Sequence, residues 1–169
     1  MELQALRSAT RTMLDDVVEP YLWPDADIDR RLNNAVREAC IRARLLKDDA
    51  VSNPKLCSIA VAANQATVTL DPSIMVVRSG ITLGGCHKLW CVQAASMDRM
   101  DPNWDNGEQS ARTTEFLIMD LAQKTLRLHP VPDSAITIRL RVWRVPTEAE
   151  EMEGDTDEPV IALPDPEDL

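Results

Sequence analysis

A chain of 169 residues with 44% apolar side chains can bury one hydrophobic core, so we expect one domain, with two small subdomains as the alternative. The net charge of −10 argues against nucleic-acid binding, which requires clustered lysine and arginine. This charge lies entirely in residues 148–169, which contain no Lys or Arg and whose acidic residues are Glu148, Glu150, Glu151, Glu153, Asp155, Asp157, Glu158, Asp165, Glu167 and Asp168. The composition predicts a neutral body with an acidic arm.

The N-terminal segment carries charges throughout, which excludes a signal peptide, and no apolar run is long enough for a membrane helix. We therefore expect a soluble, intracellular protein. The four cysteines fall in apolar stretches, which indicates buried free thiols rather than a disulfide framework. Aromatic side chains make up only 4% of the residues, which is too few to favour a surface that stacks on bases or sugars.

Two helices are predicted in residues 1–50. Apolar residues recur at helical spacing over residues 2–17, which indicates an amphipathic helix. A short connector at 21–23 precedes a second helix from about Asp25 to about Lys47, whose early acidic residues suit a helix start. We expect Trp23 to pack as a staple against this helix, with a subunit contact as the alternative.

From Lys55 onward the apolar period changes to two, which predicts strands. Residues 55–72 indicate a hairpin that turns at 63–65, and residues 74–93 indicate another that turns at Gly84-Gly85. Residues 94–113 are expected to form a loop with at most one helical turn, in which Trp104 lies, whereas Trp90 and Trp143 lie in predicted strands and are assigned to the core.

A third hairpin is predicted for residues 115–132, and the strand 135–146 closes the region. Six strands in residues 51–147 predict an antiparallel β-sandwich or small barrel, and with the helices the fold class is α+β. The helical part is thus residues 1–50, the β domain is 51–147 and the acidic, proline-containing C-terminal arm is 148–169.

The arm contains one apolar cluster, whose members are Val160, Ile161, Ala162 and Leu163. An apolar cluster in a polar arm can dock on a sheet edge or groove of a partner, and it can equally pack on its own domain. We assign these four residues and Trp104 as candidate partner contacts. Removing residues 148–169 is expected to leave the β domain folded and to weaken assembly, because the arm carries charge and little core.

No catalytic or metal site is predicted. The acidic residues Asp25, Asp27 and Asp29 start like a calcium loop but lack its glycine and its last glutamate. The group Cys86-His87 with Cys91 supplies too few ligands at the wrong spacing for structural zinc. His129 precedes a proline turn without any nucleophile signature nearby. We therefore expect no enzyme, no metal and no cofactor.

Five segments follow one another along the chain: YLWPDADIDRRLNNAVREACIRARLL, LCSIAVAANQATVTLDPSIMVVRSGITLGG, MDRMDPNW, KTLRLHPVPDSAITIRLRVWRVP and DEPVIALPDPEDL. In this order the chain, from about residue 3 onward, resembles bacteriophage head-to-tail adaptor proteins, also called connector or tail tubular A-type proteins. The resemblance implies a helical body with an inserted β domain. It also implies a ring, usually of twelve subunits, that joins the portal protein to the tail nozzle or tube protein around a DNA channel.

The same resemblance implies a virion protein that assembles in the host cytoplasm, without membrane contact and without specific binding to the DNA that passes. A neutral or acidic surface suits such a channel, because a basic wall would hold phosphates. In these proteins a further C-terminal helix and an arm reach the portal or a neighbouring subunit. Residues 164–169 resemble only the beginning of that helix.

Two other functions follow from the residues alone. A small-ligand or carbohydrate-binding β domain is suggested by six strands together with Trp90, Trp104 and Trp143. A hydrolase with an unfamiliar site is suggested only by His87 and His129.

Overall fold

A computed structural model describes residues 1–83, 87–106, 110–111, 113–119 and 124–161. The chain forms two compact units. The helical unit comprises Met1–Leu46 and Val145–Leu169, and the β unit comprises Lys47–Arg144. None of the helices in the described ranges is both long enough and apolar enough to cross a membrane.

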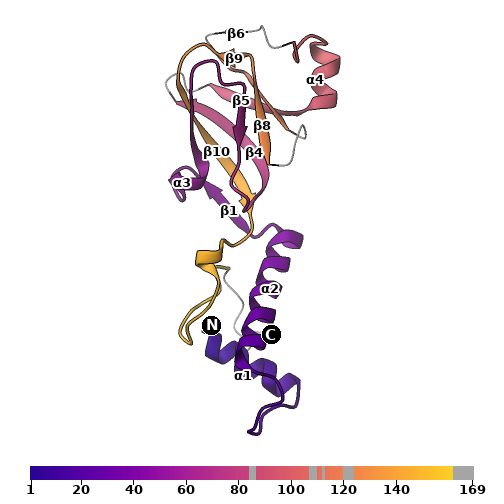
Figure 1. The fold of residues 1–169 in the computed structure, drawn as a ribbon, viewed down its shortest axis with the longest axis vertical. Coiled ribbons are helices and arrows are strands. Elements are labelled where there is room, and N and C mark those ends of the chain that lie inside the picture. Colours follow the sequence, from indigo (N-terminus) through magenta and orange to yellow (C-terminus); the bar gives the residue numbers. More distant parts are fainter. Residues whose placement is uncertain (84–86, 107–109, 112, 120–123, 162–169) are drawn as a thin grey trace. The chain divides into compact units, whose positions relative to one another are not determined.

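The longest helix of the helical unit is α2, which spans Asp25–Ala43 (Figure 1). Asp25 and Asp27 lie in its first turn, where carboxylates stabilise the positive end of the helix dipole. The helix ends before the predicted residue 47, because Arg44 has a left-handed backbone with a φ of 51°.

Helix α1 spans Leu3–Met13 and is shorter than the predicted 2–17. Its last turn closes when the N–H of Asp16 donates to the carbonyl of Arg11. Between them Asp15 has a positive φ of 57°, which a helix cannot continue through. The chain therefore leaves the helix early and forms a longer connector than the sequence predicts.

Residues 145–161, which we call the return segment, pack back on the helical unit. The segment contains a single short helix, η1, at Glu148–Glu150, which Thr147 and Glu150 cap reciprocally. Met152 is only 2% exposed, and its backbone N–H and carbonyl both bond to the side-chain amide of Asn33 on α2, at 3.0 Å each. The described part of the acidic arm is thus an integral layer of the helical unit.

The β unit contains one eight-stranded sheet and a small two-stranded sheet. The short helices of this unit are α3 (Pro54–Cys57) and α4 (Ala94–Met100). The strands are β1 (Leu46–Asp49), β2 (Ser58–Val61), β3 (Thr67–Thr69), β4 (Ile74–Leu83), β5 (Lys88–Gln93), β6 (Ser110–Ala111), β7 (Phe116–Met119), β8 (Thr125–His129), β9 (Val131–Pro132) and β10 (Ile136–Arg144).

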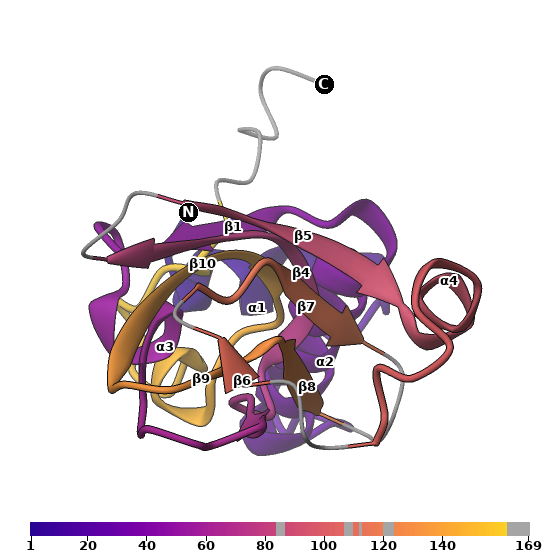
Figure 2. The same cartoon turned by 90° about the horizontal axis from the view of Figure 1, so that it is seen from above.

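The strand order of the large sheet is β1-β10-β4-β5-β7-β8-β3, with β2 also paired to β10. The sheet curls strongly into a half-barrel around one core, as the view from above shows (Figure 2). The predicted α+β class is confirmed. The pairs β2–β10, β4–β10, β3–β8, β4–β5 and β7–β8 are antiparallel as expected, whereas β5–β7 and β6–β9 run parallel.

The predicted pairing of strands is right for two hairpins and wrong for one. Strands β4 and β5 pair antiparallel, and so do β7 and β8. The predicted hairpin at 55–72 does not form, because β2 pairs with β10 whereas β3 pairs with β8. The turns at Gly84-Gly85 and at 121–123 lie outside the described residues.

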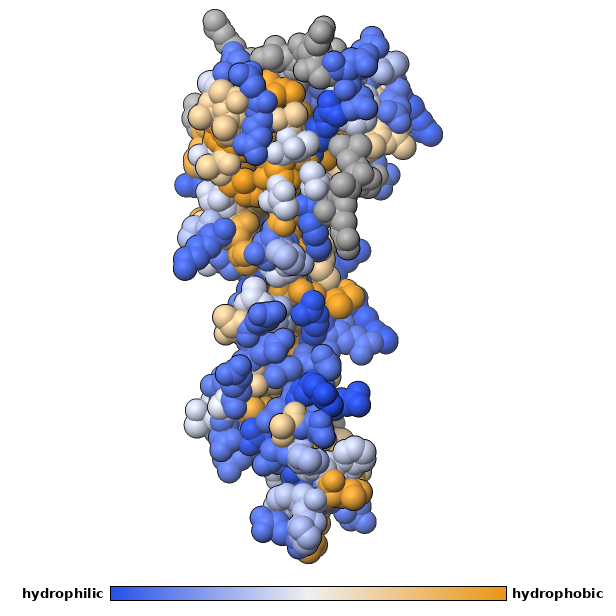
Figure 3. All heavy atoms as spheres, viewed as in Figure 1, coloured by the Kyte–Doolittle hydropathy of each residue, from blue (hydrophilic) through white to orange (hydrophobic). Residues whose placement is uncertain are grey.

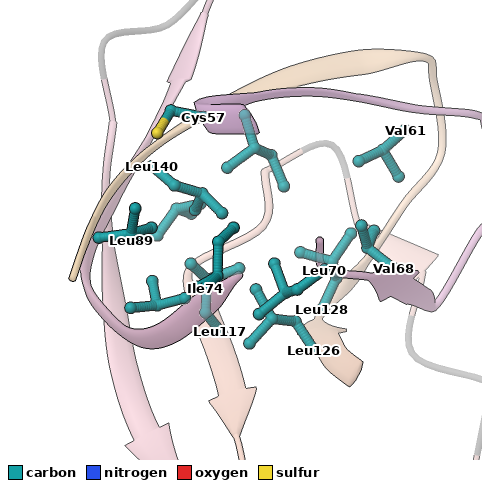
Figure 4. Close-up of a cluster of buried hydrophobic side chains, with 13 residues drawn as sticks. Cys57, Val61, Val68, Leu70, Ile74, Leu89, Leu117, Leu126, Leu128 and Leu140 are labelled. Atoms are coloured by element: carbon teal, nitrogen blue, oxygen red, sulfur yellow. The ribbon is translucent and has the colours of Figure 1, made fainter. Parts of the chain in front are cut away.

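The core of the half-barrel is aliphatic. Its buried side chains lie together in one cluster (Figure 4). They are Cys57, Val61, Val68, Leu70, Ile74, Val77, Leu89, Leu117, Leu126, Leu128, Ile138, Leu140 and Val142. Gly80 lies on β4 directly over this core, where an added Cβ would come within 2.6 Å of Leu117. The glycine allows β4 and the side chains below it to approach closely.

Candidate interaction surfaces

Of the predicted contacts in the acidic arm, the structure describes Val160 and Ile161, while Ala162 and Leu163 lie outside the described residues. Ile161 is 6% exposed and packs within the helical unit. Val160 is half-buried beside Asn33 and Val36 of α2. The alternative that the cluster packs on its own unit therefore holds for these two residues, and a partner contact there stays a prediction.

Trp104, the predicted contact in the loop, is buried at 5% exposure. It packs with Met97 and Ile118 in a second small core, and its indole N–H donates to Asp98 at 2.8 Å. Arg127 stacks on the ring, 4.9 Å from its centroid. Its partner contact also stays a prediction, because no partner is present, but its packing is that of a core residue.

The other two tryptophans of the β unit also differ from expectation. Trp90 was expected in the core, but its side chain is 61% exposed, and Trp143 is half-buried with Arg78 stacked on its ring at 4.6 Å. On β5 adjacent residues are apolar, so alternation alone does not say which face is inward, whereas on β10 Trp143 alternates with Arg139 and Arg141 and lies on their polar face. The exposed aromatic surface is therefore on the sheet rather than in the loop.

A further surface that the sequence did not identify lies in the connector, which we define as residues 14–24. It is organised by a buried ion pair in which Arg11 donates to Asp16 at 2.7 Å. Asp16 also accepts the N–H groups of Leu22 and Trp23, at 2.8 and 3.2 Å. Arg11 in turn donates to the carbonyl of Trp23 and to Asp25.

The same guanidinium lies over the ring of Tyr21, 3.8 Å from its centroid. The polar contacts of Arg11 and Asp16 stabilise the conformation of the connector, so this conformation does not depend on burying apolar side chains. Large apolar side chains accordingly face solvent at the end of the helical unit (Figure 3), and they are Met13, Leu14, Val17, Val18, Tyr21, Leu22 and Trp23. We call this set the apolar tip.

Beside the apolar tip lies an open groove of about 370 Å³. Its lining combines the apolar side chains of Leu14, Trp23 and Ile28 with the polar or charged side chains of Thr10, Asp27, Arg30 and Arg31. Contiguous exposed apolar surface of this kind marks interaction sites in soluble proteins. Trp23 is about half exposed and lines the groove, so it is available for contact, in addition to any staple role.

The pKa of Asp16 lies below the ordinary value of 3.8, chiefly because the N–H of Leu22 donates to its carboxylate, with Trp23 and Arg11 adding to the effect. A carboxyl whose pKa is lower in the folded state stabilises the fold above its unfolded pKa, and this is lost as pH falls through the folded value. We therefore expect the stabilisation that Asp16 contributes to be complete above about pH 5 and to be lost progressively as the pH falls below it.

Asp16→Asn is the variant that tests this acid dependence. It should be less stable than the wild type at pH 7, because Arg11 then lacks a buried counter-charge, and it should lose less stability on acidification. Thermal unfolding followed by circular dichroism at 222 nm between pH 2 and pH 7 measures both effects. Thr12→Ala, at an exposed position of α1, is the control, and parallel pH curves for wild type and Asp16→Asn would contradict the assignment.

The residues considered for chemistry form structural contacts instead. Asp25, Asp27 and Asp29 each pair with a different arginine. His129 is buried, 3.5 Å from Asp101. Within the described ranges, no group of three or more His, Cys, Asp or Glu side chains is arranged to hold a metal ion.

No curated protein matches the chain. A sequence model described as SU10 adaptor protein matches residues 1–168, almost the whole chain. A match over this length covers both the helical unit and the β unit, and it is consistent with surfaces made for contact rather than for catalysis. The chain belongs to the SU10 adaptor protein family, whose members are non-enzymatic phage structural adaptors.

Proposed function

We propose that this protein is a head-to-tail adaptor that assembles as a ring between the portal and the tail of a virion, around the channel through which DNA passes. The observation that carries the proposal is the family match over residues 1–168. Adaptors of this family bind other virion proteins. Twelve subunits, as in the proteins the sequence resembles, and assembly in the host cytoplasm are parts of the same proposal.

The apolar tip supports this function. An adaptor needs a surface that stays well ordered before its partner arrives, because ordering a loop on binding costs affinity. The Arg11–Asp16 pair provides that order while leaving the apolar side chains of the connector free. We assign the apolar tip to the contact with the portal, which would cover side chains that are otherwise in water.

The net charge supports passage of DNA without binding. The helical unit holds eighteen Asp and Glu against seven Arg, and the β unit holds ten against eleven Lys and Arg. A wall of this composition repels phosphates or is neutral towards them. DNA can then move along the channel without binding tightly to its wall.

The test is co-assembly with the purified portal of the same phage, imaged by negative-stain microscopy. Leu22→Asp should abolish co-assembly, because it places a carboxylate on a side chain that is 77% exposed in the apolar tip. Val51→Asp is the matched control, since Val51 is exposed on the β unit outside the tip. A wild-type chain that stays monomeric both alone and with portal would falsify the proposed function.

A further inference from the structure

The β unit presents a basic and aromatic face on the outer side of β5, β4 and β10. The pairing register places Lys88 beside Ile81 and Ile81 beside Arg139, so these three side chains share one face of the sheet. Trp90, Arg141 and Trp143 follow at the alternate positions of their strands and lie on the same side. The opposite face carries Leu89 and Leu140 of the core.

A β-bulge adds a further cation to this face. Arg141 pairs with Ser79 and Val142 pairs with Val77, so Arg78 is the extra residue between them. A bulge redirects its side chain, and here the guanidinium lies over the ring of Trp143. Lys88 similarly lies over Trp90, at 5.3 Å from the ring centroid. We call the set Arg78, Lys88, Trp90, Arg139, Arg141 and Trp143 the basic face.

The cations of the basic face have no carboxylate partner within ion-pair distance among the residues that the structure describes. On adjoining elements, the pKa of Asp49 of β1 is lowered chiefly by the N–H of Ser52 and least by Arg141, and Glu115 stands just before β7. The basic face thus brings together four exposed cations without an ion pair, on a chain whose net charge is −10.

The complementary surface lies on the return segment of the same chain. Glu151 and Glu153 are exposed on either side of the buried Met152, and the described residues include no ion pair for either of them. Glu151 has an extended backbone. Two side chains at alternate positions of extended backbone stand about 7 Å apart, which is also the spacing of Arg139 and Arg141 on β10.

We propose that the basic face of one copy binds Glu151 and Glu153 of a second copy. Because the two surfaces differ, the contact is head-to-tail, and repetition of such a contact closes a ring or extends a filament. The inference rests on the proposed ring-forming function and names the surfaces that join neighbouring subunits. DNA is the other occupant that a basic and aromatic face could take, and the test below distinguishes the two.

Two charge reversals test the contact by sedimentation velocity. Arg139→Glu/Arg141→Glu and Glu151→Arg/Glu153→Arg should each weaken self-association roughly tenfold or more, because like charges then face each other. An equimolar mixture of the two variants should assemble again, because each supplies the charge that the other needs. The single chain that carries all four substitutions should assemble for the same reason.

Lys55→Glu/Arg99→Glu is the control, since it changes the net charge of the β unit equally at exposed residues outside the basic face, and it should self-associate like the wild type. All six residues are exposed, so circular dichroism should show unchanged folding. The proposal is overturned if the wild type stays monomeric alone, if either reversal assembles normally, or if the mixture does not assemble.

Binding of nucleic acid is tested separately, by a mobility-shift assay with double-stranded DNA. Binding by the wild type that Arg139→Glu/Arg141→Glu abolishes would assign the face to DNA and overturn the proposal. If the contact between copies is overturned, the proposed adaptor function is still tested independently, because co-assembly with portal is measured separately. A chain that joins the portal but ignores the charge reversals forms its ring through other surfaces.

Discussion

Leu117→Ala is expected to lower the free energy of unfolding of the β unit by about 2–5 kcal/mol. Leu117 is fully buried on β7 and belongs to the aliphatic core (Figure 4). Truncation removes apolar contacts and leaves a cavity that rigid neighbouring strands cannot fill. Urea unfolding followed by tryptophan fluorescence measures the loss, since Trp90, Trp104 and Trp143 all lie in the β unit.

Ile81→Ala is the control for this variant, because Ile81 on β4 faces the outer side of the sheet and is partly exposed. It should cost much less than Leu117→Ala. An equal cost for the two substitutions would mean that the half-barrel is not packed around Leu117 as described.

Gly80 supplies a second check on the same core. Gly80→Ala alone should destabilise the β unit by about 1–3 kcal/mol, because its Cβ would lie 2.6 Å from a Leu117 methyl. In the Leu117→Ala background this methyl is absent, so the cost should fall. The two substitutions would then be non-additive, as expected of residues in direct contact. Additive losses would contradict the close approach.

The sequence predicted the positions of helices and strands better than it predicted which strands pair with each other. Helical periodicity placed α2, and alternation placed β4, β7 and β10 within a few residues. The hairpin at 55–72 failed because alternation describes a strand but not its neighbour, and β2 and β3 find partners far along the chain. Long-range pairing depends on how the whole sheet curls, which local patterns do not contain.

The inner and outer faces of β5 were also not predicted correctly. On β5, Leu89 and Trp90 are adjacent and both apolar, so either could face the core. The structure buries Leu89 beside Gly80, where no side chain occupies the space, and the larger Trp90 is left outside with Lys88 over its ring. Lys88 two residues before Trp90 was the available signal, since a lysine at the alternate position marks a solvent face.

The connector was missed for a different reason. Asp15 and Asp16 lie near the end of the predicted helix 2–17, where carboxylates are ordinarily solvated, but Asp16 is buried against Arg11 and accepts two backbone N–H groups. Nothing in the local sequence distinguishes a carboxylate that organises a loop from one in water. The many apolar residues from Met13 to Trp23 were a usable signal of an interaction surface, because an ordinary surface loop of this length would carry more polar side chains.

The acidic arm was expected to contain little core, and this is wrong for its described part. Although the segment is acidic overall, it contains two buried apolar side chains, those of Met152 and Ile161. Backbone hydrogen bonds tie the segment down as well, with the N–H groups of Leu3 and Gln4 donating to the carbonyls of Asp157 and Asp155. The low hydrophobicity of the arm therefore describes its outer surface only.

Deleting residues 148–169 should consequently unfold or strongly destabilise the helical unit while the β unit stays folded. The deletion removes the cover of α1 and α2, and it leaves the amide of Asn33 and the N–H of Leu3 without their partners. Circular dichroism at 222 nm should show a lost or lowered helical transition. Tryptophan fluorescence should report an unchanged β transition.

Met152→Ala separates this effect from a simple loss of charge. It should cost the helical unit about 2–5 kcal/mol, because it empties a fully enclosed site on α2 without changing any charge. Thr156→Ala in the same segment is exposed and should be neutral. If Met152→Ala left the helical transition unchanged, the return segment would be an accessory tail. If the transition falls, the acidic residues of this segment are carried by part of the fold, which gives Glu151 and Glu153 the fixed positions that a specific contact between subunits requires.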